Sequence, residues 1–206
     1  MRATTRLLPL FLFAFAAAGS GQALAQETAV AGPGRAEITI IPGGATFFTE
    51  NADTNAPSFG SYSLGGAVTY NVNRYFGLEG EVGSTLGVSQ SLDFGFPTDV
   101  RTPDMFSYSG NAVVSLANRS SVVPYVTGGV GGLTLLSNDD FGVNDAQTFL
   151  TGNVGGGVKW YAGRWGLRAD YRFIAVQSQD DAPAFFGRDN RYGHRVYGAV
   201  MLNLGR

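Results

Sequence analysis

The chain has 206 residues, with 14 lysines and arginines against 16 aspartates and glutamates, and it contains no cysteine. The lack of cysteine excludes disulfides and thiolate metal sites, and the absence of a basic stripe excludes nucleic acid as a partner. The 30 glycines and 13% aromatic residues follow no short repeat, so they fit a β-barrel wall better than a linker or collagen.

The first 25 residues have the pattern of a cleaved signal peptide. Arg2 and Arg6 precede an apolar run over residues 7–18, and an Ala-x-Ala site ends at Ala25, where we expect cleavage. The apolar run is shorter than the roughly 20 residues that a membrane-spanning helix needs. The predicted organisation is a signal peptide over residues 1–25, a flexible lead over residues 26–34 and one β-domain over residues 35–206.

Eight segments of the mature chain alternate apolar with polar or small residues, as half-buried β-strands do. They span residues 36–48, 61–71, 75–87, 105–117, 122–135, 148–161, 165–176 and 192–204. Pro42-Gly43-Gly44 interrupts the first segment and predicts a bulge there. Short connections alternate with long ones, which is typical of outer-membrane barrels with short periplasmic turns and longer extracellular loops. The pattern predicts an all-β fold, an eight-stranded antiparallel up-and-down transmembrane barrel with a periplasmic N-terminus.

The hairpin over residues 148–176 shows the alternation most clearly. On its second segment, Arg168, Asp170 and Arg172 share one face, and the apolar residues from Trp165 to Phe173 share the other. Side chains alternate between the two faces of a strand, so this ribbon has a charged face and an apolar face. A charge that faces lipid at the membrane midplane costs about 2–4 kcal/mol. We therefore expect the charged face to line the barrel interior.

Charges are distributed unequally between connections and strands. The long connections hold 11 of the 16 acids and, by these boundaries, only three bases, Arg101, Arg188 and Arg191. The strands hold four acids and four bases, which predicts pairing inside the barrel rather than a charged channel. The third and seventh strands are opposite in a closed ring of eight, so their charges can meet across the lumen. The predicted interior charge cluster is Glu79, Glu81, Lys159, Arg168, Asp170 and Arg172.

Two interpretations of this cluster remain open. An eight-stranded barrel is just wide enough for side chains to fill it, so the cluster can be a structural plug. It can also be the gate of a narrow pore. Polar interiors are usual in these barrels, which favours the plug.

Aromatic residues flank the predicted short turns, where membrane barrels carry their interfacial girdles. The predicted membrane-interface aromatics are Tyr70, Tyr75, Phe76, Trp160, Tyr161 and Trp165.

Enzymatic and metal sites have little support in the sequence. His194 is the only histidine, and Ser178 lies in the adjoining connection. A lipid-modifying enzyme would need a histidine paired with a serine or an acid near the extracellular rim. The face of His194 matches that of Val196, which predicts a position toward lipid. The acidic connections match no EF-hand spacing, so we interpret them as solvated loops rather than a calcium site. We expect no catalytic, cofactor-binding or metal-binding residues.

Several stretches resemble the small eight-stranded outer-membrane barrels of the OmpA/OmpX type. They are LGGAVTYNVNRYFGLEGEVG (64–83), VPYVTGGVGG (123–132), VGGGVKWY (154–161), WGLRADYRF (165–173) and HRVYGAVMLNL (194–204). The resemblance implies a bacterial outer-membrane location, contact with lipid and lipopolysaccharide, insertion by the barrel-assembly machinery and a monomeric state. It implies a structural or surface-interaction role, in envelope integrity, adhesion or ligand binding through the loops. The alternative is a narrow porin-like channel, and a lipid-modifying enzyme has less support.

Overall fold

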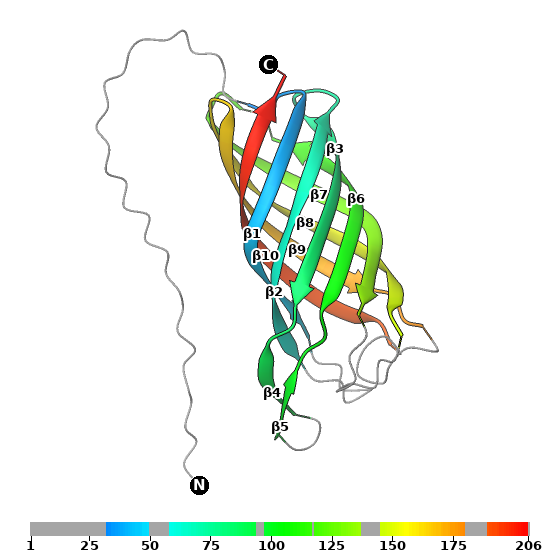
Figure 1. Ribbon diagram of the computed structural model, residues 1–206. Coiled ribbons are helices and arrows are strands. Elements are labelled where there is room, and N and C mark those ends of the chain that lie inside the picture. The colour runs from blue at the N-terminus through cyan, green and yellow to red at the C-terminus, as the bar shows by residue number, and fades with distance from the viewer. Residues whose placement is uncertain are drawn as a thin grey trace, which may run out of the picture.

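The computed structural model describes residues 32–49, 58–93, 97–116, 118–136, 145–179 and 189–205 (Figure 1). The predicted signal peptide over residues 1–25 and its cleavage site lie outside the described residues, as does most of the predicted lead over residues 26–34. Within the described part of the chain, no helix is long and apolar enough to cross a membrane.

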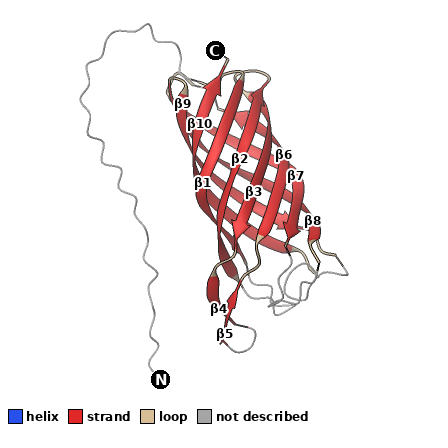
Figure 2. Cartoon of the chain, viewed as in Figure 1, coloured by secondary structure: helices blue, strands red, loops and turns tan. Residues whose placement is uncertain are grey.

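Eight strands close into one antiparallel barrel in the order β1-β10-β9-β8-β7-β6-β3-β2, and β4 and β5 form a separate hairpin (Figure 2). The strands are β1 (Ala36–Phe48), β2 (Phe59–Asn71), β3 (Phe76–Leu86), β4 (Ser89–Asp93), β5 (Pro97–Arg101), β6 (Met105–Ser115), β7 (Val122–Leu135), β8 (Gln147–Ala162), β9 (Trp165–Val176) and β10 (Arg191–Leu204). The prediction of an eight-stranded antiparallel barrel is confirmed.

The predicted segments agree closely with the barrel strands. β1, β7 and β9 have the predicted bounds, and every end of the other five lies within two residues of its prediction. The predicted bulge is also present, because the pairing of β1 with β10 shifts register between Ile40 and Gly43. The β4–β5 hairpin was not predicted, since its short strands are mostly polar and lack an apolar alternation.

The two ends of the barrel differ. The short connections β2–β3, β6–β7 and β8–β9 lie at one end together with both ends of the barrel sheet, where Ala36 pairs with Leu204. We call this the turn end, and it is uppermost in Figure 1. The strand ends joined by the four long connections lie at the other end, the loop end, together with the β4–β5 hairpin.

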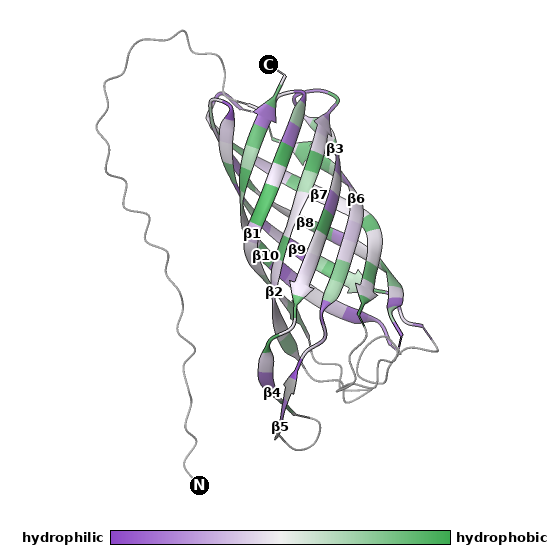
Figure 3. Ribbon diagram, viewed as in Figure 1, coloured by the Kyte–Doolittle hydropathy of each residue, from purple (hydrophilic) through white to green (hydrophobic). Residues whose placement is uncertain are grey.

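Alternation along each strand separates the two surfaces of the wall. The outer surface is apolar, with Ile40, Val130 and Leu150 each more than half exposed. The inner surface buries polar and charged side chains, and Figure 3 shows the resulting alternation of hydrophobic and hydrophilic residues. A wall that exposes its apolar face and buries its charged one is the reverse of a soluble β-protein and is suited to lipid.

Candidate functional site: the filled barrel interior

The middle of the lumen holds an ion-pair network formed by Glu79 and Glu81 of β3, Arg168, Asp170 and Arg172 of β9, and Arg195 of β10. β3 and β9 lie opposite each other in the ring, because three strands separate them on either side. Arg168 reaches across the lumen to Glu79, with Nη1 2.5 Å from Oε2 and Nη2 3.3 Å from Oε1. An arginine suits this role because its planar fork can bind both oxygens of a carboxylate.

Arg168 is also held on its own side of the barrel. Its Nη2 donates to Asp170 Oδ2 at 2.8 Å, and its Nε donates to Tyr125 Oη at 2.7 Å. The Tyr125 hydroxyl in turn donates to Asp170. The guanidinium therefore has an acid on each side of the lumen and a tyrosine that fixes its plane.

Arg172 and Arg195 extend the network toward the loop end. Arg172 Nη2 lies 2.9 Å from Glu79 Oε1 and 3.3 Å from Glu81 Oε2, and its Nε donates to Asp170 Oδ1 at 3.0 Å. Arg195 pairs with Glu81. Arg195 is one of the four bases on the predicted strands, but the predicted cluster omitted it; its partner Glu81 lies 114 positions away in the sequence.

A second ion pair lies nearer the turn end and is separate from the ion-pair network. Lys159 Nζ lies 2.5 Å from Glu37 Oε2, and both side chains are completely buried. Lys159 also lies over the Tyr125 ring, 5.3 Å from its centroid. Lys159 was predicted to lie in the interior cluster, but it pairs with Glu37, which the predicted cluster omitted.

The prediction that Tyr161 is a membrane-interface aromatic is wrong. Tyr161 is 2% exposed and donates its hydroxyl to Glu37 Oε1 at 2.7 Å, so it belongs to the Lys159–Glu37 site. The reason is alternation: Tyr161 is two residues after Lys159 and therefore points to the same side of β8. The structure places the other five aromatics, Tyr70, Tyr75, Phe76, Trp160 and Trp165, on the exposed outer surface at or near the turn end.

Glycines of β8 make room for these long side chains. Gly155 and Gly157 face the lumen opposite Arg172 and Asp170 of β9. A Cβ at Gly157 would lie 2.0 Å from the Ala169 carbonyl oxygen and 2.8 Å from Tyr125 Oη. The inner wall of β8 is therefore flat where the network crosses it.

Gly157→Ala should destabilise the barrel by about 1–3 kcal/mol, because the added methyl overpacks a fixed backbone contact. The matched control is Gly152→Ala on the same strand, where a Cβ meets no atom within 4 Å. Urea titration of the protein folded in detergent micelles would compare the two variants. Equal stability of both would show that the wall tolerates a side chain at Gly157.

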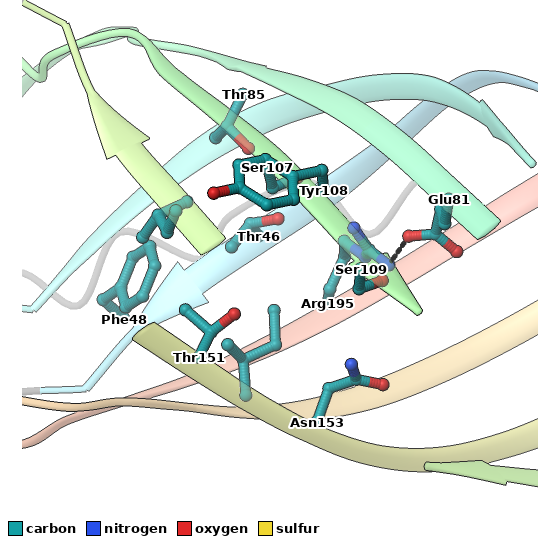
Figure 4. A pocket seen from close by; sticks show the side chains of 12 residues that line it. Thr46, Phe48, Glu81, Thr85, Ser107, Tyr108, Ser109, Thr151, Asn153 and Arg195 are labelled. Atoms are coloured by element: carbon teal, nitrogen blue, oxygen red, sulfur yellow. Dashed lines mark hydrogen bonds and ion pairs between the residues drawn. The ribbon is translucent and has the colours of Figure 1, made fainter. Parts of the chain in front are cut away.

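On the loop side of the ion-pair network lies a small cavity with a mixed lining. Its volume is about 40 Å³, and Glu81, Arg195, Asn153 and Thr151 line it together with Phe48 and other residues (Figure 4). Arg195 Nε is buried and has no hydrogen-bond partner among the described residues. The cavity has room for a few water molecules, which would satisfy such a group.

An apolar cap closes the lumen at the loop end. It consists of Phe48, Phe59, Leu92, Met105, Leu133, Leu135, Phe149 and Val176. Leu92 comes from the β4–β5 hairpin, and Gln90 of the same strand binds the Gly60 backbone through both its amide oxygen and its amide nitrogen. Six of the eight barrel strands, β1, β2, β6, β7, β8 and β9, contribute inward residues near their loop ends, and these residues individually gave no signal in the sequence. The described part of the lumen thus contains an ion-pair layer, a small cavity and an apolar cap in succession.

His194 lies on the outer wall, as its alternation predicts. Its Nδ1 is 2.7 Å from the Tyr171 hydroxyl, and its ring packs against Phe173. Ser178 instead uses its backbone amide to donate to Asn190 Oδ1. Among the described residues, no three histidines, aspartates or glutamates come together as a metal site.

Arg191 differs from its predicted position in a long connection. It begins β10 and is buried, 5.9 Å from the Phe59 ring centroid under the apolar cap. The long connections therefore carry Arg101 and Arg188 as their only bases, and their acidic excess is larger than predicted.

Three solved structures are similar to the chain, and the first of them supports the fold. Neisserial surface protein A has a TM-score of 0.60 at 14% identity, over 84% of this chain and 99% of that one. The N-terminal barrel of OprF from Pseudomonas aeruginosa has a TM-score of 0.48 at 15% identity, over 82% and 99%. Ail from Yersinia pestis, solved with the heparin analogue sucrose octasulfate, has a TM-score of 0.44 at 19% identity, over 81% and 96%.

The comparison with protein families is decisive. No curated protein sequence matches the chain. The model of the outer membrane protein beta-barrel domain matches residues 11–197, which is most of the chain. The closed eight-stranded ring, the apolar outer wall and the charged interior are all as this assignment requires. The chain therefore belongs to the outer membrane protein beta-barrel domain family.

Proposed function

We propose that this protein is a non-enzymatic surface barrel that reinforces the outer membrane and uses its loop end to bind extracellular partners. The observation that carries the proposal is the contrast between the two parts of the molecule. The lumen is filled by ion pairs and an apolar cap, whereas the long connections concentrate 11 of the 16 acids. A scaffold that is filled inside and carries long loops at one rim is organised for binding at that rim.

The acidic loop end favours basic partners. Long-range attraction between opposite charges speeds encounter and helps select partners, even where it adds little affinity. The proposal predicts that neutralising loop acids impairs binding without disturbing the barrel.

A complemented deletion strain tests this role. One strain carries the wild-type protein and another carries Asp139, Asp140, Asp145, Asp180 and Asp181 replaced by asparagine. Both should restore resistance to detergent, since the barrel is intact, but only the wild type should restore adhesion to a positively charged surface. Equal adhesion by both strains would contradict a binding role for the loop acids.

The proposal also requires that the loop end faces outward and the N-terminus faces the periplasm. Because the chain has no cysteine, single cysteines can report the orientation directly. A membrane-impermeant maleimide should label Asp145→Cys in intact cells but label Arg164→Cys, in the β8–β9 turn, only after the outer membrane is opened. The reverse pattern would refute this orientation.

The alternative of a narrow pore gives a different electrical result. Arg168, Arg172, Lys159 and Glu37 are each at most 2% exposed, so the described lumen contains no continuous row of hydrated charges. Planar bilayers with the wild-type protein should therefore show little conductance, and Arg168→Ala should show more. A large, steady wild-type conductance would make the channel the leading function.

A further inference from the structure

The outer wall carries a groove at the loop end that the filled interior does not explain. Its centre is a row of outward-facing residues on four neighbouring strands, in which Gly152 pairs with both Val130 and Ala175, and Ala175 pairs with Tyr192. The two central residues are small and the two outer ones are large. The resulting groove has a volume of about 310 Å³, and Leu150, Gln177 and Asn190 also line it.

The small size of Gly152 is not required by the fold. A Cβ at Gly152 would meet no atom within 4 Å. Among the described glycines, a positive φ occurs at Gly163 and Gly205 and not at Gly152. Gly155 and Gly157 on the same strand differ, because a Cβ there would collide with backbone oxygen. Glycine weakens a strand interior and often marks a place where a ligand approaches closely.

The groove lies at the height where acyl chains meet head groups. Trp165 lies at the turn end of β9 and is 61% exposed, and Ala175 comes ten positions later on the same strand. At about 3.3 Å per residue and a strand tilt of about 40°, these ten positions span about 25 Å of height, the height of the apolar band of such barrels. The amide side chains of Gln177 and Asn190 follow directly on the loop side.

We propose that this groove binds one acyl chain of lipid A, with Gln177 and Asn190 at the head-group end. The assignment to lipid A rests on the proposed orientation, which places the loop end in the outer leaflet. An apolar floor with amides at one end matches an amphiphile, and amides can hydrogen-bond to sugar and phosphate oxygens.

The shape of the groove favours a lipid chain over a second barrel. Val130 and Tyr192 are three strand spacings apart, about 14 Å, and the small residues occupy only the middle of that width. Two convex barrel walls meet along their projecting side chains, so a neighbouring barrel would leave this depression unfilled. A single flexible acyl chain fits it, and the groove is continuous with the lipid-facing wall.

Native mass spectrometry of the full protein in detergent tests the proposal, with hexa-acylated lipid A and phosphatidylethanolamine as separate probes. The test variant is Gly152→Leu, which fills the groove. The control is Gly198→Leu on β10, an outward-facing glycine whose Cβ also meets no atom within 4 Å. Heat-modifiable migration on gels verifies that each variant is folded before binding is measured.

The wild type and Gly198→Leu should each retain one lipid A molecule, and Gly152→Leu should retain it about tenfold less, as expected when about two buried methylene contacts are lost. Equal retention by all three proteins would overturn the proposal, as would retention of phosphatidylethanolamine as strong as that of lipid A. A dimer that disappears in Gly152→Leu would replace it with self-association. Because this measurement is made in detergent, it is independent of the cysteine-labelling test of orientation.

Discussion

Arg168→Ala should lower the free energy of unfolding by about 3–5 kcal/mol, because it leaves Glu79 and Asp170 with one arginine fewer in a closed interior. Arg168 is buried and, like Arg172, it joins the two sides of the lumen. The measurement is a urea titration of folding in detergent micelles or lipid vesicles. Arg101→Ala is the control, since the Arg101–Asp104 pair is exposed and such pairs contribute at most about 1 kcal/mol.

A double-mutant cycle separates the pair from its surroundings. Glu79→Ala alone should also be strongly destabilising, because it removes an acid from both Arg168 and Arg172. Arg168→Ala combined with Glu79→Ala should cost less than the sum of the single changes. Each substitution removes a charge that the other substitution alone would leave without its partner. Strictly additive losses would show that the two side chains do not interact.

Glu37→Leu should cost about 3–5 kcal/mol in the same assay, because it leaves the completely buried Lys159 ammonium without an acid. The remaining contact of Lys159 with the Tyr125 ring cannot replace a carboxylate at 2.5 Å. Tyr161→Phe removes only one hydrogen bond to Glu37 and should cost about 1–2 kcal/mol.

Replacing both members of the pair provides the decisive comparison. Glu37→Leu with Lys159→Met should recover most of the stability lost in the single variant, because well-packed apolar side chains often substitute for a buried ion pair without loss. If the double variant is as unstable as Glu37→Leu alone, the damage comes from packing at Glu37 and not from a stranded charge.

The strand pattern was readable from the sequence because alternation with period two is a local property. It gave all eight barrel strands within two residues at each end and the inward face of Glu79, Arg168 and Arg172. The error at Tyr161 arose where proximity to a turn was weighted above alternation. The same alternation that places Lys159 inside also places Tyr161 inside.

Only some partners across the lumen were readable, because alternation gives the face of a residue and not its height. Lys159 pairs with Glu37 and Arg195 with Glu81, which depends on the tilt and stagger of strands on different sides of the ring. The apolar cap was missed for a related reason. Phe48, Phe59, Met105 and Phe149 come from different strands, and only closure of the barrel brings them together.

Closure between β1 and β10 also sets how the chain can enter a membrane. Glu37 and Lys159 are 122 positions apart in the sequence. The sheet that carries them closes only when Ala36, at the start of the first barrel strand, pairs with Leu204, at the end of the last one. A hairpin crossing the bilayer alone would expose its charges to lipid before their partners arrived, at about 2–4 kcal/mol for each basic side chain. Folding and insertion should therefore be one concerted event, with a single kinetic phase and a rate that falls as the bilayer thickens.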